Sequence, residues 1–159
     1  MSARTASHHR AVALVARRLR ATGVTVTILD PMRSHGVALV GILPDGVTVH
    51  VAVRASTRQL RNIQVTTPSG TYRYRVWQYV FNLHAHGTRT TQADWWVLVP
   101  LDAPAQAWLL PSRIVGPTRQ TYTIVADVAR PRNVLHAYRG RWGIVAGHEG
   151  KDRARGKAA

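Results

Sequence analysis

The stretch GVALVGILPDGVTVHVAVR, residues 36–54, specifies two adjacent strands. Its first half, residues 36–43, is a continuous apolar run, which is typical of a strand buried on both faces. A Pro-Asp-Gly turn at 44–46 follows, in which Pro fixes φ and Gly accepts positive φ. Residues 47–54 then alternate, with valines on one face. The opposite face carries Thr48, His50, Ala52 and Arg54. The sequence therefore predicts a β-hairpin over 36–54.

Hydrophobic spacing predicts further elements on both sides of this hairpin. Apolar residues at helical spacing indicate a helix over about 8–21, capped by Ser7 and ended by Gly23. A loop with a short strand at 71–75 is expected between residues 55 and 75. The remaining predictions are strands at 24–30, 93–101 and 107–112, a strand or loop at 121–127, a short helix at 131–138 and a closing strand at 141–147. Residues 76–85 suit a second helix, with one long strand through 72–81 as the alternative.

Length and composition indicate one globular domain. The chain has 159 residues, of which 45% are hydrophobic, and it contains no cysteine. We expect an α/β fold with a mixed sheet flanked by helices over 7–147, a flexible segment at 1–6 and a basic disordered segment at 148–159. No apolar run reaches the ~18 residues that a membrane span needs, so we expect a cytoplasmic protein with no membrane contact.

The charge of the chain points to a polyanionic partner. Lys and Arg number 22 against 7 Asp and Glu, which gives a formal net charge of +15, and only Lys151 and Lys157 are lysines. Residues 1–23 and 54–75 each carry five arginines and no acid. Guanidinium groups match phosphate geometry, and an unbalanced positive domain repels itself unless a polyanion is near. Nucleic acid, with DNA favoured over RNA, is therefore the expected partner.

Three segments carry a resemblance to a known family, and together they span about residues 7–112. They are HHRAVALVARRLRATGVTVTILDP (8–31), SHGVALVGILPDGVTVHVAVRAST (34–57) and QADWWVLVPLDAPAQAWLLPS (92–112). In sequence and in element order the chain resembles the PD-(D/E)XK nucleases. The resemblance implies a restriction-endonuclease-like core. It also suggests a protein of a phage or mobile element that works beside a protein partner or as a homodimer.

Active members of that family hold Mg²⁺ with carboxylates, and a lysine stabilises charge near the attacking water. The resemblance places the strand-start acid at Val37, the Glu-x-Lys-like triplet on Ala52-Val53-Arg54, and the helix acid near Arg10. Only Arg54 keeps the expected charge. The resemblance thus implies a degenerate core without metal or cofactor, which binds nucleic acid and does not cut it.

Two other functions stay open at this stage. An active, magnesium-dependent endonuclease could assemble a displaced site from Asp30, Asp45 and Asp94. Against it, Asp45 lies in a turn and should face solvent, while Asp30 and Asp94 suit local caps or bridges. His50 is either a phosphate contact or general base, or an inward histidine whose hydrogen bonds are satisfied. The third function is a small basic subunit of a nucleoprotein assembly.

Arginines outside the apolar segments are the expected contacts to nucleic acid. The candidates are Arg10, Arg17, Arg54, Arg58, Arg61, Arg73, Arg75, Arg139 and Arg141. Tyr72 and Tyr74 interleave with two of these arginines, which suits contact with unpaired bases, or an edge strand with amphipathic side chains. The sequence contains no phosphate-binding loop and no nucleophile-elbow motif.

Overall fold

The structure is a computed structural model that describes residues 2–30, 36–85, 88–89, 93–116, 121–125 and 134–147. Its elements follow the chain in this order: α1 (Ala3–Ala21), β1 (Thr25–Ile28), β2 (Leu39–Ile42), β3 (Thr48–Ser56), β4 (Gln59–Thr67), β5 (Gly70–Asn82), β6 (His84–Ala85), β7 (Thr88–Arg89), β8 (Trp95–Pro100), η1 (Pro104–Gln106), β9 (Trp108–Pro111), α2 (Ser112–Val115), β10 (Thr121–Val125), η2 (Val134–Tyr138) and η3 (Trp142–Ile144). The η elements are 3₁₀ helices. None of the helices in this described part of the chain is long and apolar enough to cross a membrane.

A five-stranded mixed sheet forms the centre of the molecule, with strand order β1-β2-β3-β8-β9. The predicted hairpin is confirmed, because β2 and β3 pair antiparallel with Leu39 opposite Val51. β3 and β8 run parallel, with Val51 opposite Trp95, whereas the other pairs in this sheet are antiparallel. The expected α/β class with a mixed sheet is therefore correct.

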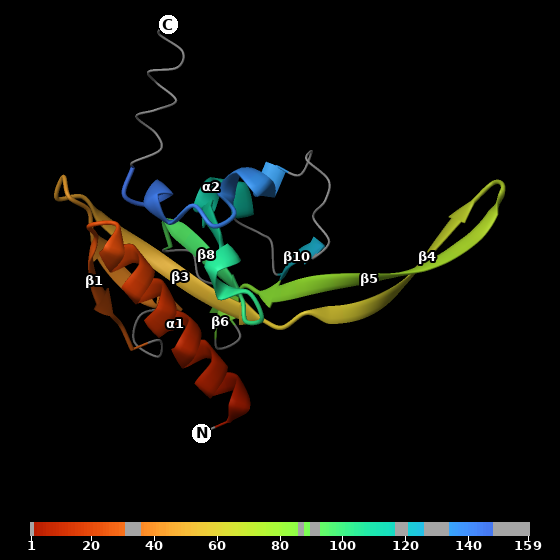
Figure 1. The fold of residues 1–159 in the computed structure, drawn as a ribbon, viewed down its shortest axis with the longest axis horizontal. Coiled ribbons are helices and arrows are strands. Elements are labelled where there is room, and N and C mark those ends of the chain that lie inside the picture. Colours follow the sequence, from red (N-terminus) through yellow and green to blue (C-terminus); the bar gives the residue numbers. More distant parts are fainter. Residues whose placement is uncertain are drawn as a thin grey trace, which may run out of the picture.

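Helix α1 covers one face of this sheet (Figure 1). Its buried stripe is Ala11, Val12, Val15, Ala16 and Leu19, as the spacing predicts. The helix begins at Ala3 rather than near residue 8, because the Ser2 hydroxyl accepts a hydrogen bond from the Thr5 N–H and caps the first turn. The prediction of Ser7 as the cap is therefore wrong. The segment 1–6, which was expected to be flexible, is helical from residue 3 onwards.

The opposite face of the sheet is also covered, so both faces are core. Ala52 and Trp96 lie on this face and are almost fully buried. The C-terminal half of β5 packs over them with Tyr79 and Phe81, and Leu83, the residue after the strand, joins the same cluster. Strand β10 pairs antiparallel with β5 and adds its own buried side chains. The covered second face explains why a strand such as β3 has successive buried residues.

Strands β4 and β5 pair along their length to form an arm that extends away from the body (Figure 1). The loop predicted from residue 55 is wrong for most of its length, as is the helix over 76–85, whereas the short strand at 71–75 and the long strand through 72–81 both lie within β5. Val76 and Val80 follow a helical spacing, but Tyr79, Phe81 and Leu83 repeat every second residue and are the ones buried. Burial against the sheet therefore selects the two-residue period.

The C-terminal part of the described chain is less regular than predicted. The strand at 121–127 is confirmed over Thr121–Val125, and residues 126–127 lie outside the described residues. The short helix predicted at 131–138 is a 3₁₀ helix over Val134–Tyr138. The closing strand predicted at 141–147 is wrong, because Trp142–Ile144 is a 3₁₀ helix that buries Trp142. The segment 148–159 lies outside the described residues.

Candidate nucleic-acid interface

Val37, Ala52 and Arg54, the positions that the resemblance assigns to metal ligands and a catalytic cation, come together beside β3. Ala38 donates its N–H to Val51 O, although Leu39 is the residue paired with Val51, so two residues face one as in a β-bulge. Val37 and Ala52 have exposed fractions of 1% and 0%. Arg54 Nη1 lies 3.4 Å from the carbonyl oxygen of Gly36. At these three positions the structure therefore has two buried hydrocarbon side chains and one cation.

The guanidinium of Arg54 holds several segments together. It lies 5.1 Å from the centroid of the Trp96 ring. Its Nη1 donates to Val53 O at 2.9 Å, and its Nη2 donates to Leu83 O at 3.4 Å. Burial lowers the pKa of Arg54 to about 10, which leaves the group charged at neutral pH. A cation surrounded by carbonyl oxygens and an indole does not fit a site for Mg²⁺, since hard divalent ions need anionic oxygen ligands.

His8 of α1 lies close enough to Arg54 for the charge of the guanidinium to affect its pKa. Burial, then the charge of Arg54, then His9 lower the pKa of His8. Arg10, the residue expected at the helix-acid position, is exposed instead. The contact between His8 and Arg54 could not be expected from the sequence, because His8 precedes the apolar stripe on which the helix prediction rests.

The three aspartates of the alternative endonuclease site do not form a metal cluster. Asp45 faces solvent in the turn, as predicted, and its Oδ1 accepts from the Val47 N–H at 3.0 Å. Asp94 accepts from the His50 N–H at 2.7 Å and lies 3.4 Å from His50 Nδ1, so it bridges β3 and β8 locally. Asp30 is exposed just beyond β1. Within the described ranges, no three His, Asp or Glu side chains gather where they could hold a metal ion.

His50 also differs from one of its two interpretations. An inward histidine is wrong, because 46% of the His50 side chain is exposed. The imidazole lies beside Asp94, near the N-terminal end of β3, rather than in the core.

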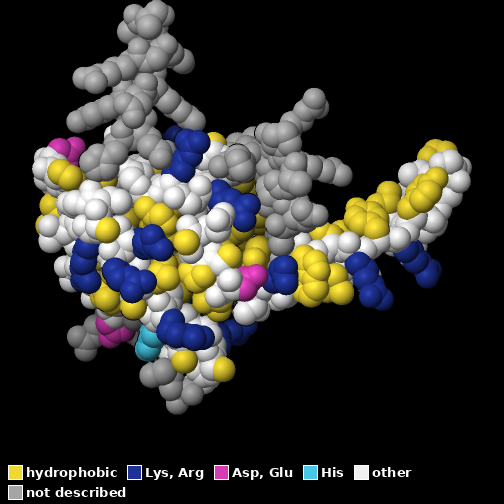
Figure 2. Space-filling view, viewed as in Figure 1, with side chains coloured by type: hydrophobic (Ala, Val, Ile, Leu, Met, Phe, Trp, Pro, Cys, Tyr) yellow, Lys and Arg dark blue, Asp and Glu magenta, His cyan; other side chains and the backbone are white. Residues whose placement is uncertain are grey.

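The arm has two chemically different faces. Directly opposite residues of an antiparallel pair share a face, so the register of β4 and β5 fixes which side chains lie together. We call one side the basic arm face, and it comprises Asn62, Gln64, Arg73 and Arg75. We call the other side the tyrosine face, and it comprises Ile63, Val65, Tyr72 and Tyr74. Figure 2 shows arginine side chains along one side of the arm and hydrophobic side chains along the other.

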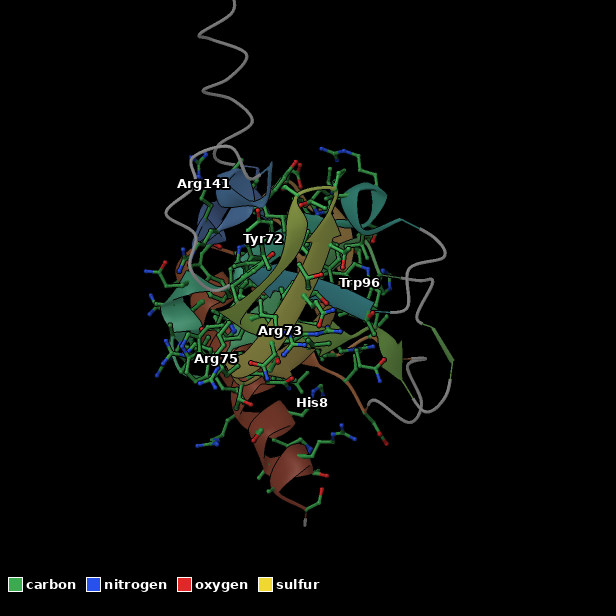
Figure 3. All side chains as sticks on the ribbon, turned by 90° about the vertical axis from the view of Figure 1, so that its right-hand side faces the viewer. His8, Tyr72, Arg73, Arg75, Trp96 and Arg141 are labelled. Carbon is green, nitrogen blue, oxygen red and sulfur yellow. The ribbon has the colours of Figure 1, made fainter. Side chains whose placement is uncertain are left out.

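The predicted contact of Tyr72 and Tyr74 with unpaired bases concerns the tyrosine face alone. Tyr72 and Tyr74 have exposed fractions of 55% and 52%, so both are available for contact. They point away from Arg73 and Arg75, however, and Figure 3 shows Tyr72 on the opposite side of the arm from both arginines. A single ligand lying flat against the arm contacts either Arg73 and Arg75 or the two tyrosines.

The root of the arm is fixed to the body by a small polar and aromatic cluster. The Arg58 guanidinium lies 4.5 Å from the centroid of the Trp77 ring, on the side of the basic arm face. Arg58 Nε lies 3.8 Å from Asp102 Oδ2, and the Tyr79 hydroxyl donates to the same oxygen at 2.9 Å. Burial and this hydrogen bond raise the pKa of Tyr79 to about 12, so the hydroxyl remains a donor.

The other predicted contacts do not form one surface with the arm. Arg10 and Arg17 are exposed on α1, and Arg61 is exposed on the same side of the arm as the tyrosine face. Arg139 is half-buried, with its guanidinium 5.5 Å from the centroid of the Trp108 ring. Arg141 is exposed, and Figure 3 places it at the other end of the view from Arg73, Arg75 and His8. The predicted set therefore divides into at least two surfaces.

The fold is similar to that of a bacterial homing endonuclease, I-Ssp6803I. The two structures align with a TM-score of 0.65 and 17% sequence identity, over 100% of each chain. No protein-family model matches the chain, and no curated protein matches it. The likeness confirms the nuclease-like fold that was expected from the order of the elements.

Proposed function

We propose that this protein binds double-stranded DNA on a degenerate PD-(D/E)XK nuclease core and does not cleave it. The basic arm face is the principal contact surface. The observation that carries the proposal is the pairing of an exposed, positively charged arm with a buried apolar cluster where metal ligands would stand. The neighbouring fold belongs to a homing endonuclease, which supports DNA as the nucleic acid.

The charge distribution supports binding through phosphates. The net charge of +15 is far from neutrality, and the exposed arginines of α1 add to those of the arm. A protein that neutralises phosphates with arginine releases counterions from the duplex, so its affinity depends steeply on salt. We assign Arg54 no part in this contact, since its Nη1 and Nη2 donate to backbone carbonyl oxygens of the protein itself.

The proposed lack of cleavage rests on Val37 and Ala52. Neither side chain can ligate a metal ion, and both are buried. The neighbouring charge of Arg54 would repel a divalent cation at that place. No described carboxylate cluster replaces the missing ligands.

The proposal is tested by binding and cleavage assays on the same preparation. A labelled duplex is titrated with the full chain from ~50 to ~200 mM salt, where ~6–10 phosphate contacts predict a loss of ~10³–10⁵ in affinity. Supercoiled plasmid is then incubated with the protein and Mg²⁺ or Mn²⁺, and no nicking is expected. An affinity that does not change between these salt concentrations would contradict the proposed interface.

Metal-dependent cleavage would overturn the proposed inactivity. The alternative endonuclease would be established if Asp30→Ala or Asp94→Ala abolished that cleavage while leaving binding intact. Equal affinity for duplex, single-stranded and branched DNA would favour the structural subunit of a nucleoprotein assembly instead.

A further inference from the structure

We propose that the basic arm face reads base-pair edges in the major groove of DNA, and that Arg73 and Arg75 determine sequence preference. This inference rests on the proposed function and makes it more specific. Its basis is the chemistry of the face, which combines two guanidinium groups with the amides of Asn62 and Gln64.

The pairing register brings these four side chains together in two cross-strand pairs. Asn62 lies opposite Arg75, and Gln64 lies opposite Arg73. Directly opposite side chains in an antiparallel pair are ~5 Å apart, so each arginine has an amide beside it. All four residues are exposed, and they lie on the face of the arm opposite the tyrosine face.

The spacing of the two pairs matches the repeat of the duplex. Residues two apart on a strand are ~7 Å apart, because each residue rises by ~3.3–3.4 Å. One base pair rises by ~3.4 Å, so the two arginines are about two base pairs apart. A two-stranded ribbon fits the major groove of B-DNA, which is ~12 Å wide.

The side-chain types are those that distinguish base pairs. Arginine donates two hydrogen bonds to the O6 and N7 of guanine, whereas Asn and Gln pair with the N6 and N7 of adenine. An amide presents an acceptor as well as donors, and a base edge can use both, whereas a phosphate can only accept hydrogen bonds. The amides of Asn62 and Gln64 therefore indicate base contact in addition to charge.

The separation of the two faces favours duplex DNA over other nucleic acids. Single strands bind through bases stacked on aromatic rings, but Tyr72 and Tyr74 are on the face opposite the arginines. Duplex RNA has a deep, narrow major groove that side chains cannot enter. A major-groove reader needs polar side chains gathered on one face, as Asn62, Gln64, Arg73 and Arg75 are.

The arm is also held in a defined direction. Asp102 binds Tyr79 and lies close to Arg58, and the Arg58 guanidinium stacks on Trp77 at the root of the basic arm face. A recognition element that is fixed before binding loses less conformational entropy when the complex forms. This cluster therefore serves as a positioning group for the readout.

The test is selection of preferred sites from a pool of random duplexes by the full chain, repeated with Arg73→Ala and Arg75→Ala. Arg61→Ala is the matched control, because it removes the same side chain from the other side of the arm. Circular dichroism verifies that each variant is folded. The wild type should select a preferred sequence, and each test variant should lose preference at one base pair, the two positions lying about two base pairs apart.

Affinities separate base readout from phosphate contact. Each test variant should lose about 10-fold or more on the selected duplex and less than about 3-fold on an unrelated one, while Arg61→Ala changes the two affinities equally. An equal loss on all sequences, with a salt slope reduced by ~1, would overturn base readout. Binding by the wild type without sequence preference would overturn base readout and leave the proposed function standing. Failure to bind any duplex would overturn both.

Discussion

The molecule contains two long hairpins that use the same backbone pattern for opposite purposes. In the hairpin of β2 and β3, Val51, Ala52 and Val53 are successive residues and all are fully buried, because α1 covers one face and β5 the other. In the arm formed by β4 and β5, both faces from Arg61 to Arg75 are exposed or half-buried. The strand pattern alone therefore does not show where a ligand binds, since the covering elements decide which side chains are accessible.

The largest expected difference is in the free energy of unfolding when one tryptophan is removed, either beside the β2–β3 hairpin or in the arm. Trp96→Ala beside β3 removes a ring that is 1% exposed and should lower the free energy of unfolding by ~3–5 kcal/mol. Trp77→Ala at the root of the arm removes a ring that is 42% exposed and should cost ~1 kcal/mol or less. Urea denaturation measures both. Equal losses would mean that the arm is part of the cooperative core.

A smaller difference is expected for single substitutions to alanine in the two hairpins. A Cβ at Gly41 in β2 would lie 2.9 Å from Val24 Cγ1 and 3.1 Å from Val49 Cγ2. Gly41→Ala should therefore destabilise the protein by ~1–3 kcal/mol through overpacking. Thr71→Ala on the arm, where the residue is exposed, should change stability by no more than ~0.5 kcal/mol. A neutral Gly41→Ala would contradict the described packing between β1, β2 and β3.

The smallest effect concerns pH and the contact between α1 and Arg54. Burial and then Arg54 lower the pKa of His8, so the unfolded chain binds a proton at this site at higher pH than the folded chain does. Stability from His8 is therefore lost as the pH falls through ~6.5, the ordinary value for histidine, towards the lower folded pKa. His8→Gln should flatten the decline of stability between about pH 8 and pH 5. Identical pH profiles for wild type and variant would contradict the placement of His8.

Much of the body could be predicted because its signals are local and mutually consistent. The Pro-Asp-Gly turn and the alternating valines determine the β2–β3 hairpin, and the stripe from Ala11 to Leu19 determines the buried face of α1. The start of α1 was missed because a cap at Ser2 precedes several polar residues, which leaves no apolar period to detect.

The arm could not be recognised from hydrophobic alternation, since neither of its faces is covered. The available signals were weaker: β-branched residues such as Ile63 and Val65, and a two-residue connection at Pro68-Ser69 between Thr67 and Gly70. The separation of arginines from tyrosines follows from the strand period once the register is known. The cluster around Arg54 depends on long-range contacts with Gly36, Leu83 and Trp96, which the linear sequence does not reveal.

The most direct test compares two variants on the duplex that the wild type selects, at one salt concentration. Arg73→Ala/Arg75→Ala removes the guanidinium groups of the basic arm face, and Arg54→Met replaces the buried cation by an apolar side chain of similar size, which such sites often tolerate. The account predicts that the dissociation constant rises by ~100-fold or more for the arm variant. The Arg54 donors are directed inward, so the dissociation constant of Arg54→Met should change by less than ~3-fold. A large loss for Arg54→Met with an unchanged arm variant would contradict the assignment of binding to the arm.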